Sequence, residues 1–184
     1  MNLLASRGQL RASLARWALL LVPAVLLAGF LSGELSGSGP GNPWFDSLAK
    51  PDLYPPPITF GIAWTILYVL MGLAFAVVCS AWGARGRGIA IAAFLVQLAL
   101  NLAWSPVFFG AHQITAALYL LVAIDIAVLV TLVLFWRIRW HAGAMLVPYL
   151  AWVLFATLLT WQLFQLNPHA DGGTTSGAVQ RIAL

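Results

Sequence analysis

Charged residues and cysteine are both scarce in this chain. Of its 184 residues only 8% are charged, with 9 Lys and Arg against 5 Asp and Glu, whereas 62% are hydrophobic. This composition leaves too little polar surface to cover a soluble globule, so we expect a membrane protein. The one cysteine, Cys79, excludes an intrachain disulfide and is too few for a cysteine metal site.

Catalytic and metal-ligating patterns are missing from the sequence as well. It has no nucleophile with a neighbouring base, no paired acids and no phosphate-binding glycine loop. His112, His141 and His169 are scattered at or beyond the ends of apolar runs, which argues against a histidine metal site. We therefore predict no catalytic residue, no metal and no required cofactor.

Long apolar runs dominate what is present. Five stretches each approach the roughly 20 residues that cross about 30 Å of hydrocarbon. We predict spanning helices at residues 17–32, 58–80, 89–109, 114–136 and 142–164. The predicted fold is an all-α membrane protein, a five-transmembrane-helix bundle over residues 17–166. A basic extension (residues 1–16) precedes the bundle, a loop (residues 33–57) follows the first span, and a disordered tail (residues 167–184) ends the chain.

The first span allows more than one interpretation. Arg7, Arg11 and Arg16 precede an apolar run of about 15 residues and then the small residues SGELSGSG, the order found in cleaved signal peptides. A basic start is also typical of an uncleaved cytoplasmic anchor or of an amphipathic surface segment. The sequence leaves open whether this span is processed.

Lysine and arginine gather on one side of the predicted topology. Three basic segments, residues 1–16, 85–87 and 137–139, fall on one face, against Lys50 and Arg181 on the other. The positive-inside rule then predicts a multi-pass protein of a bacterial membrane, with its N-terminus inside and its C-terminus outside. The net charge of +4 follows from this topology and from anionic lipid, so it does not indicate a nucleic-acid partner.

Polar and bulky side chains recur at helical spacing on three of the predicted spans. The stripes are Gly61, Trp64, Tyr68 and Gly72 on the second span, Gln97, Asn101, Trp104 and Phe108 on the third, and Pro148, Trp152, Ala156 and Leu159 on the fifth. An amide in hydrocarbon must face partners inside the bundle. The stripes indicate a pocket in the outer half of the membrane; plain helix packing, with amides joining helices, is the alternative.

Two single residues inside the spans interrupt the apolar pattern. Pro106 cannot donate to the carbonyl of Leu102 and is predicted to kink the third helix. Asp125 is the only acid inside a span, and it is either part of a proton relay or ligand contact, or a protonated group bonded to a neighbour.

Four motifs occur together in a fixed order. They are W-F-x-x-L-x-K-P-x-x-x-P-P (Trp44 to Pro56), W-x-x-L-Y-x-x-M-G (Trp64 to Gly72), Q-L-A-L-N-x-A-W-x-P-x-F-F-G (Gln97 to Gly110) and P-Y-L-A-W-x-x-F-A (Pro148 to Ala156). On these motifs the chain resembles the translocator protein family, also called tryptophan-rich sensory protein or peripheral-type benzodiazepine receptor, and the resemblance covers roughly residues 44–164.

The resemblance implies a homodimeric five-helix protein that binds porphyrins, such as protoporphyrin, in a pocket open toward the first loop, which acts as its lid. It implies the lid residues Trp44, Lys50, Pro51 and Pro55. It implies the wall residues Trp64, Asn101, Trp104, Phe108, Trp152 and Ala156, to which the stripe on the second span adds Tyr68. Porphyrin would be a ligand here, not a required cofactor.

The composition of the first loop fits the role of a lid. The four prolines of residues 51–57 restrict the backbone and lower the entropy lost when the loop becomes ordered. Trp44, Phe45 and Tyr54 offer stacking surface to a planar ligand. Lys50 is placed to meet a porphyrin carboxylate at the rim or a lipid phosphate.

The chain departs from the resemblance at one ligand motif. The eukaryotic sterol motif needs a tyrosine and then a basic residue, whereas Trp161 and Gln165 stand in those places, so sterol is not an expected ligand. Asp125 also does not fall where relatives carry an acid on this helix. The resemblance leaves three activities open: a receptor or sensor with a regulatory or trafficking role, a light- and oxygen-dependent porphyrin-degrading enzyme, and a porphyrin transporter.

Overall fold

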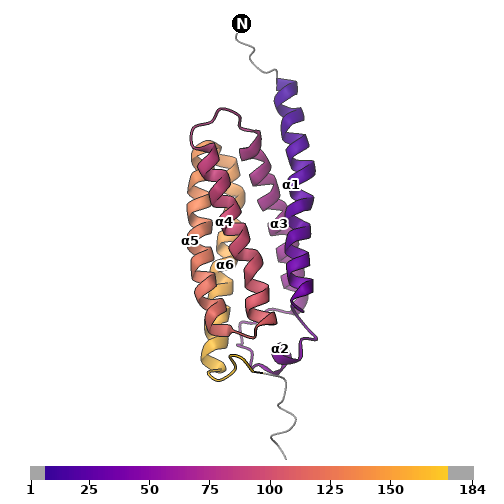
Figure 1. Cartoon of the computed structure of the whole chain (residues 1–184), viewed down its shortest axis with the longest axis vertical. Coiled ribbons are helices and arrows are strands. Elements are labelled where there is room, and N and C mark those ends of the chain that lie inside the picture. The colour runs from indigo at the N-terminus through magenta and orange to yellow at the C-terminus, as the bar shows by residue number, and fades with distance from the viewer. Residues whose placement is uncertain (1–6, 174–184) are drawn as a thin grey trace, which may run out of the picture.

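A computed structural model describes residues 7–173 as a bundle of long helices (Figure 1). Its elements are α1 (Arg7–Leu35), α2 (Pro43–Ser47), α3 (Pro57–Ser80), α4 (Arg87–Ser105), the π-helix η1 (Pro106–Gly110), α5 (Ile114–Ile138) and α6 (Trp140–Leu166). Within these residues, 5 helices are long and apolar enough to cross a membrane, which confirms the predicted all-α bundle. Figure 1 shows α1 beginning at one end of the bundle and α6 ending at the other, near α2.

The boundaries differ from the predicted ones in three places. Residues 7–16, predicted as part of a separate extension, continue into the first span as one helix. The first loop, residues 36–56, contains the short helix α2, whose N-terminus is capped by the Asn42 side chain accepting a 3.1 Å hydrogen bond from the Phe45 N–H. Residues 167–173 lie against the bundle and are not a disordered segment. The rest of the predicted tail, like residues 1–6, lies outside the described residues.

Glycines set how closely α1 approaches α3. A Cβ atom added to Gly72 on α3 would lie 2.7 Å from the Val22 Cα on α1, which is closer than real Cβ contacts occur. A Cβ at Gly29 on α1 would overlap the Tyr68 ring on α3. Because hydrocarbon gives helices no hydrophobic reason to associate, close backbone approach of this kind is what holds spanning helices together.

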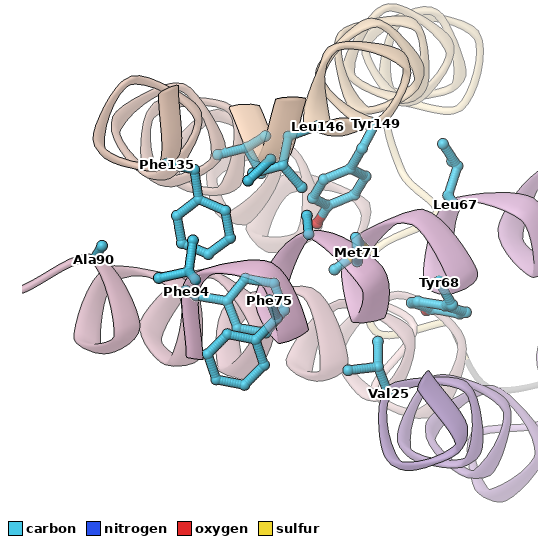
Figure 2. Packing of buried hydrophobic residues seen from close by; sticks show 14 of the residues in the cluster. Val25, Leu67, Tyr68, Met71, Phe75, Ala90, Phe94, Phe135, Leu146 and Tyr149 are labelled. Carbon is cyan, nitrogen blue, oxygen red and sulfur yellow. The ribbon is translucent and has the colours of Figure 1, made fainter. Parts of the chain in front are cut away.

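Three stacked aromatic rings lie in the core of the half of the bundle away from α2. The Phe75 and Phe94 rings stack with centroids 4.0 Å apart, and Phe94 stacks on Phe135 at 5.8 Å. Figure 2 shows these rings gathered between α3, α4 and α5, with Met71 and Leu146 further along the same core. Close packing here leaves the other half of the bundle, next to α2, as the place for a cavity.

Pro106, where the sequence predicts a kink, ends the regular α-helix of the third span. It begins η1, where hydrogen bonds close wider turns, as the 2.8 Å bond from the Ala111 N–H to the Pro106 carbonyl shows. The Leu102 carbonyl, which a proline at 106 cannot serve, accepts a 2.6 Å hydrogen bond from the Ser32 hydroxyl on α1. The irregular turn therefore ties α4 to α1.

Replacing Ser32 by alanine is expected to lower the free energy of unfolding by about 1 kcal/mol, since it leaves the partly buried Leu102 carbonyl without this donor. The same substitution should cost less in a Pro106→Ala background, where the backbone N–H restored at position 106 can bond to Leu102. Thermal unfolding of the four proteins in detergent measures this coupling. Equal losses in both backgrounds would show that the Ser32 bond does not compensate for the proline.

Candidate ligand-binding site

A cavity of about 360 Å³ lies between the spanning helices at the α2 end of the bundle. This volume falls within the range of roughly 300–1,000 Å³ that is typical of small-molecule sites. All five spanning helices and the first loop contribute to its lining. The lining is mainly aromatic and aliphatic, with a few neutral polar groups and one acid, Glu34.

The structure brings together the predicted wall residues. The cavity lining includes Trp64, Tyr68, Asn101, Trp104, Phe108, Trp152 and Ala156. They come from the three helices whose stripes indicate a pocket, namely α3, α6 and the span formed by α4 and η1. Residues that share a face of one helix thus meet those of two others around a single space.

Aromatic rings form the main surfaces of this cavity. Trp64 stacks on Tyr68 with ring centroids 5.2 Å apart and an interplanar angle of 27°. Trp104 stacks on Phe108 at 4.9 Å and 13°. Trp152 meets Phe60 edge to face at 5.8 Å. Flat faces and ring edges of this kind suit a planar aromatic ligand.

The sequence left open whether the amides of α4 line a pocket or join helices. In the structure one amide does each. The Tyr68 hydroxyl donates to Asn101 Oδ1 at 3.2 Å, and both residues line the cavity. One turn away the Tyr149 hydroxyl donates to Gln97 Oε1 at 3.0 Å, and neither of these residues lines it. Asn101 is therefore a wall residue, whereas Gln97 joins α4 to α6 beneath the cavity.

The four predicted lid residues, Trp44, Lys50, Pro51 and Pro55, belong to the first loop but do not line the cavity. Two other aromatic residues of that loop, Phe45 and Tyr54, do line it. The rings of this pair are 6.0 Å apart, and Tyr54 lies 5.2 Å from Phe60 on α3. The loop thus covers the cavity with two aromatic residues that were predicted to stack on a ligand but were not among the predicted site residues.

Lys50 braces the loop instead of facing a ligand. Its ammonium donates to the carbonyls of Phe45 at 2.6 Å and Leu48 at 3.0 Å, and it lies 4.4 Å from the centroid of the Phe45 ring. Burial lowers the pKa of Lys50 below its ordinary value, although the Asp46 carboxylate acts in the opposite direction. Lys50 donates to the loop's own backbone and does not line the pocket, at whose rim it was predicted.

The segment after α6 holds the first loop in place. The Asn167 side chain accepts a 2.9 Å hydrogen bond from the Ala49 N–H and donates a 3.0 Å bond to the Ala49 carbonyl. Asp171 caps α5, because its carboxylate accepts from the N–H groups of Ile114 at 2.6 Å and Thr115 at 3.3 Å. These long-range bonds explain why residues 167–173 are ordered in spite of their polar composition.

Trp44 also contacts the segment after α6. Its indole N–H donates to the Ala170 carbonyl at 3.0 Å, and its ring stacks on His112 at 4.7 Å. His112 has a φ of 55°, which is unfavourable for a residue with a side chain. Its ring lies 2.9 Å, through Nδ1, from the Gly173 carbonyl, and its own carbonyl accepts from the Gly172 N–H at 2.9 Å. Trp44 therefore anchors the loop to the end of the chain.

Replacing Asn167 by alanine should free the first loop, since both bonds to Ala49 are lost at once. We expect amide hydrogen exchange over residues 43–56 to become faster by about tenfold, as for a local opening that is about 1–2 kcal/mol easier. His169→Ala is the matched control, because His169 is exposed in the same segment. If Asn167→Ala leaves exchange in the loop unchanged, the segment after α6 does not hold it.

Several lining residues carried no signal in the sequence. On α1 these are Gly29, Phe30, Gly33 and Glu34, and on α5 they are Leu121 and Ile124. An apolar helix without a polar stripe does not reveal which face it turns inward. Phe60 could have been predicted from the sequence pattern, because it lies one turn before Trp64 on the stripe of the second span.

Asp125 lies away from the cavity. The Thr157 hydroxyl of α6 lies 2.8 Å from Asp125 Oδ2, within hydrogen-bonding distance, and Asp125 is not among the lining residues. Of the two interpretations of this acid, bonding to a neighbouring helix is the one that the geometry favours. Asp125 therefore joins α5 to α6.

Comparisons with known proteins agree with the motifs. The sequence model of the TspO/MBR family matches residues 19–166. The chain is 40% identical over 126 residues to the protein CrtK of Rhodobacter capsulatus, covering 68% of this chain and 79% of the relative. It is 38% identical over 144 residues to the tryptophan-rich protein TspO of Chlorobaculum tepidum (78% and 90%), and 35% identical over 147 residues to the human translocator protein (79% and 87%).

Proposed function

The chain belongs to the TspO/MBR family, and from this premise we propose that it is an integral membrane receptor or sensor that binds a tetrapyrrole, with a regulatory or trafficking role. The cavity at the α2 end is the proposed binding site. The observation that carries the proposal is its lining, in which indole rings from three spans surround one space.

The shape and chemistry of the cavity support a planar, largely apolar ligand. Stacked pairs such as Trp64 with Tyr68 and Trp104 with Phe108 present flat surfaces. The neutral polar groups of Tyr68 and Asn101 already bond to each other, so they add little cost when water leaves. A tetrapyrrole macrocycle has this combination of a large flat face and few polar atoms.

Titration with protoporphyrin, followed by tryptophan emission, tests the proposal. A porphyrin stacked near Trp64, Trp104 or Trp152 should quench that emission strongly. Trp152→Phe should weaken binding by on the order of 1 kcal/mol, the scale of a lost aromatic contact. Trp140→Phe, at the exposed opposite end, is the control and should leave affinity unchanged. Absence of saturable quenching in the parent protein would refute the proposal.

Two further assays on the same protein test the two alternative activities, porphyrin degradation and porphyrin transport. If illumination with bound porphyrin yields cleaved product that Trp152→Phe does not form, the protein is a degrading enzyme. If liposomes that contain the protein take up porphyrin faster than empty ones, it is a transporter. A receptor is expected to bind porphyrin without either result.

We also propose that the protein forms a homodimer through α4. Gly88, Ala92, Ala99 and Ala103 are all exposed and lie on one face of this helix, where a second copy can approach closely. Phenylalanine at both Ala92 and Ala99 should release monomer in mild detergent, as measured by light scattering. Ala123→Phe, on the exposed face of α5, is the control. An unchanged dimer after the α4 substitutions would place the interface elsewhere.

The proposed orientation follows from charge. The loop with Arg85 and the turn with Arg139 lie at the end of the bundle opposite to α2, whereas Asp46 and Asp52 lie in the first loop. The positive-inside rule then puts the cavity and the first loop at the outer side of the membrane.

A further inference from the structure

The mouth of the cavity can be located from the lining residues that remain exposed. These are Phe30, Glu34, Ser38, Pro40, Pro57 and Gly61. They lie on the last turns of α1, on the loop that follows, and on the first turns of α3. The cavity therefore opens between α1 and α3 beside residues 38–40, at the level where a spanning helix leaves the hydrocarbon.

Glu34 gives this mouth its charge. Among the described residues that line the cavity, Glu34 is the only one with a formal charge; the others are apolar or neutral polar. Its side chain is exposed, and within residues 7–173 its carboxylate makes no hydrogen bond and no ion pair. The carboxylate is therefore available to a group that enters the mouth.

No described base lines the cavity. Lys50 donates to the Phe45 and Leu48 carbonyls and does not line the cavity. Among the arginines of the described part of the chain, Arg87 is at the opposite end of the bundle, where it donates to the Val78 and Cys79 carbonyls. A ligand carboxylate at the mouth would therefore meet one negative charge and no basic residue of the described lining.

Building on the proposed function, we propose that Glu34 selects among tetrapyrroles by the charge of the edge that faces the mouth. The apolar cavity holds the flat ring, and the polar edge of the ligand remains at the mouth, close to water. An edge whose carboxyl groups are esterified, or which carries amines, is favoured over an edge with free carboxylates. The site thus prefers a neutral or cationic tetrapyrrole and binds the free diacid less tightly.

The size of the selection follows from Coulomb's law near a protein surface. Two unit charges about 7 Å apart, at an effective dielectric between those of protein surface and water, change an equilibrium constant by roughly three- to tenfold. Salt screens such an exposed pair, because the Debye length falls to about 3 Å at 1 M ionic strength. Salt dependence therefore distinguishes charge selection from a steric effect.

The test uses Glu34→Gln and three forms of one porphyrin: protoporphyrin, its dimethyl ester, and its diamide with a diamine, which is dicationic. Glu34→Gln should tighten binding of the diacid about fivefold, leave the ester within about twofold, and weaken the dication about fivefold. Each comparison is made within one ligand, so that partition into detergent cancels. The differences should largely vanish near 1 M salt, where the Debye length is about 3 Å.

Asp52→Asn is the matched control, since it removes one exposed acid from the first loop without touching the cavity lining. It should change none of the three affinities, and melting curves check that both variants are folded. If all three porphyrins bind the parent but Glu34→Gln leaves their affinities unchanged, charge selection is refuted while the binding site stands. Equal effects of Asp52→Asn would also refute a specific role for Glu34. If none of the three binds the parent, the proposed function itself fails.

Discussion

Replacing Gly72 by alanine is expected to lower the free energy of unfolding by about 3 kcal/mol, at the upper end of what overpacking a core costs. The added methyl would lie 2.7 Å from the Val22 Cα and 3.2 Å from the Leu21 carbonyl oxygen. Both atoms belong to the backbone of α1, so no side chain can rotate to relieve the overlap. The two helices have to separate instead.

Thermal unfolding in detergent measures this effect, and Gly61→Ala, on the same helix, is the control. A Cβ at Gly61 would meet nothing within 4 Å, so alanine there should be neutral or stabilise the helix by up to about 1 kcal/mol. Separation of α1 from α3 should also weaken porphyrin binding, because Phe30 and Glu34 of α1 line the cavity. Parent-like melting of Gly72→Ala would show that α1 and α3 are packed differently from this structure.

Replacing Ala156 by leucine is expected to reduce porphyrin affinity by about thirtyfold, equivalent to roughly 2 kcal/mol, because the larger side chain occupies space that the ligand needs. Ala156 lines the cavity one helical turn after Trp152. Since the cavity offers room for the added carbons, the melting temperature should change little. The measurement is a porphyrin titration by tryptophan quenching, with melting followed in parallel.

Ala151→Leu is the matched control for this prediction. Ala151 is on the same helix but is exposed and does not line the cavity, so leucine there should leave affinity and stability unchanged. Parent-like binding by Ala156→Leu would mean that the ligand does not occupy the cavity at the α2 end. A lower melting temperature without loss of binding would point to a packing role for Ala156.

The wall of the cavity was predictable because it lies on regular helices. Along a helix, residues three or four apart share a face, so Trp64 with Tyr68 and Asn101 with Trp104 were expected to project together. An amide in hydrocarbon has to face the interior, which fixed the direction of that face. The structure adds that the stripes converge, because α3, α4 and α6 surround one space.

The first loop was not predictable in the same way. Trp44 and Lys50 were expected at the ligand, since aromatic and basic residues in a loop commonly bind. Their partners are instead backbone carbonyls, of Ala170 for Trp44 and of Phe45 for Lys50. The Ala170 contact joins residues 126 positions apart, and no local pattern reports such a contact.

The sequence by itself determined the membrane class, the number of spans, the family and the inward faces of three helices. Each of these follows from hydrophobic length, helical period or an ordered set of motifs, all of which are local along the chain. Only the tertiary structure decided where the cavity opens, that α1 supplies its rim, and that Glu34 is the one charged residue in its described lining. Those features depend on which helices lie side by side, and the contact of α1 with α3 rests on the absence of a side chain at Gly72, which a hydrophobicity pattern does not record.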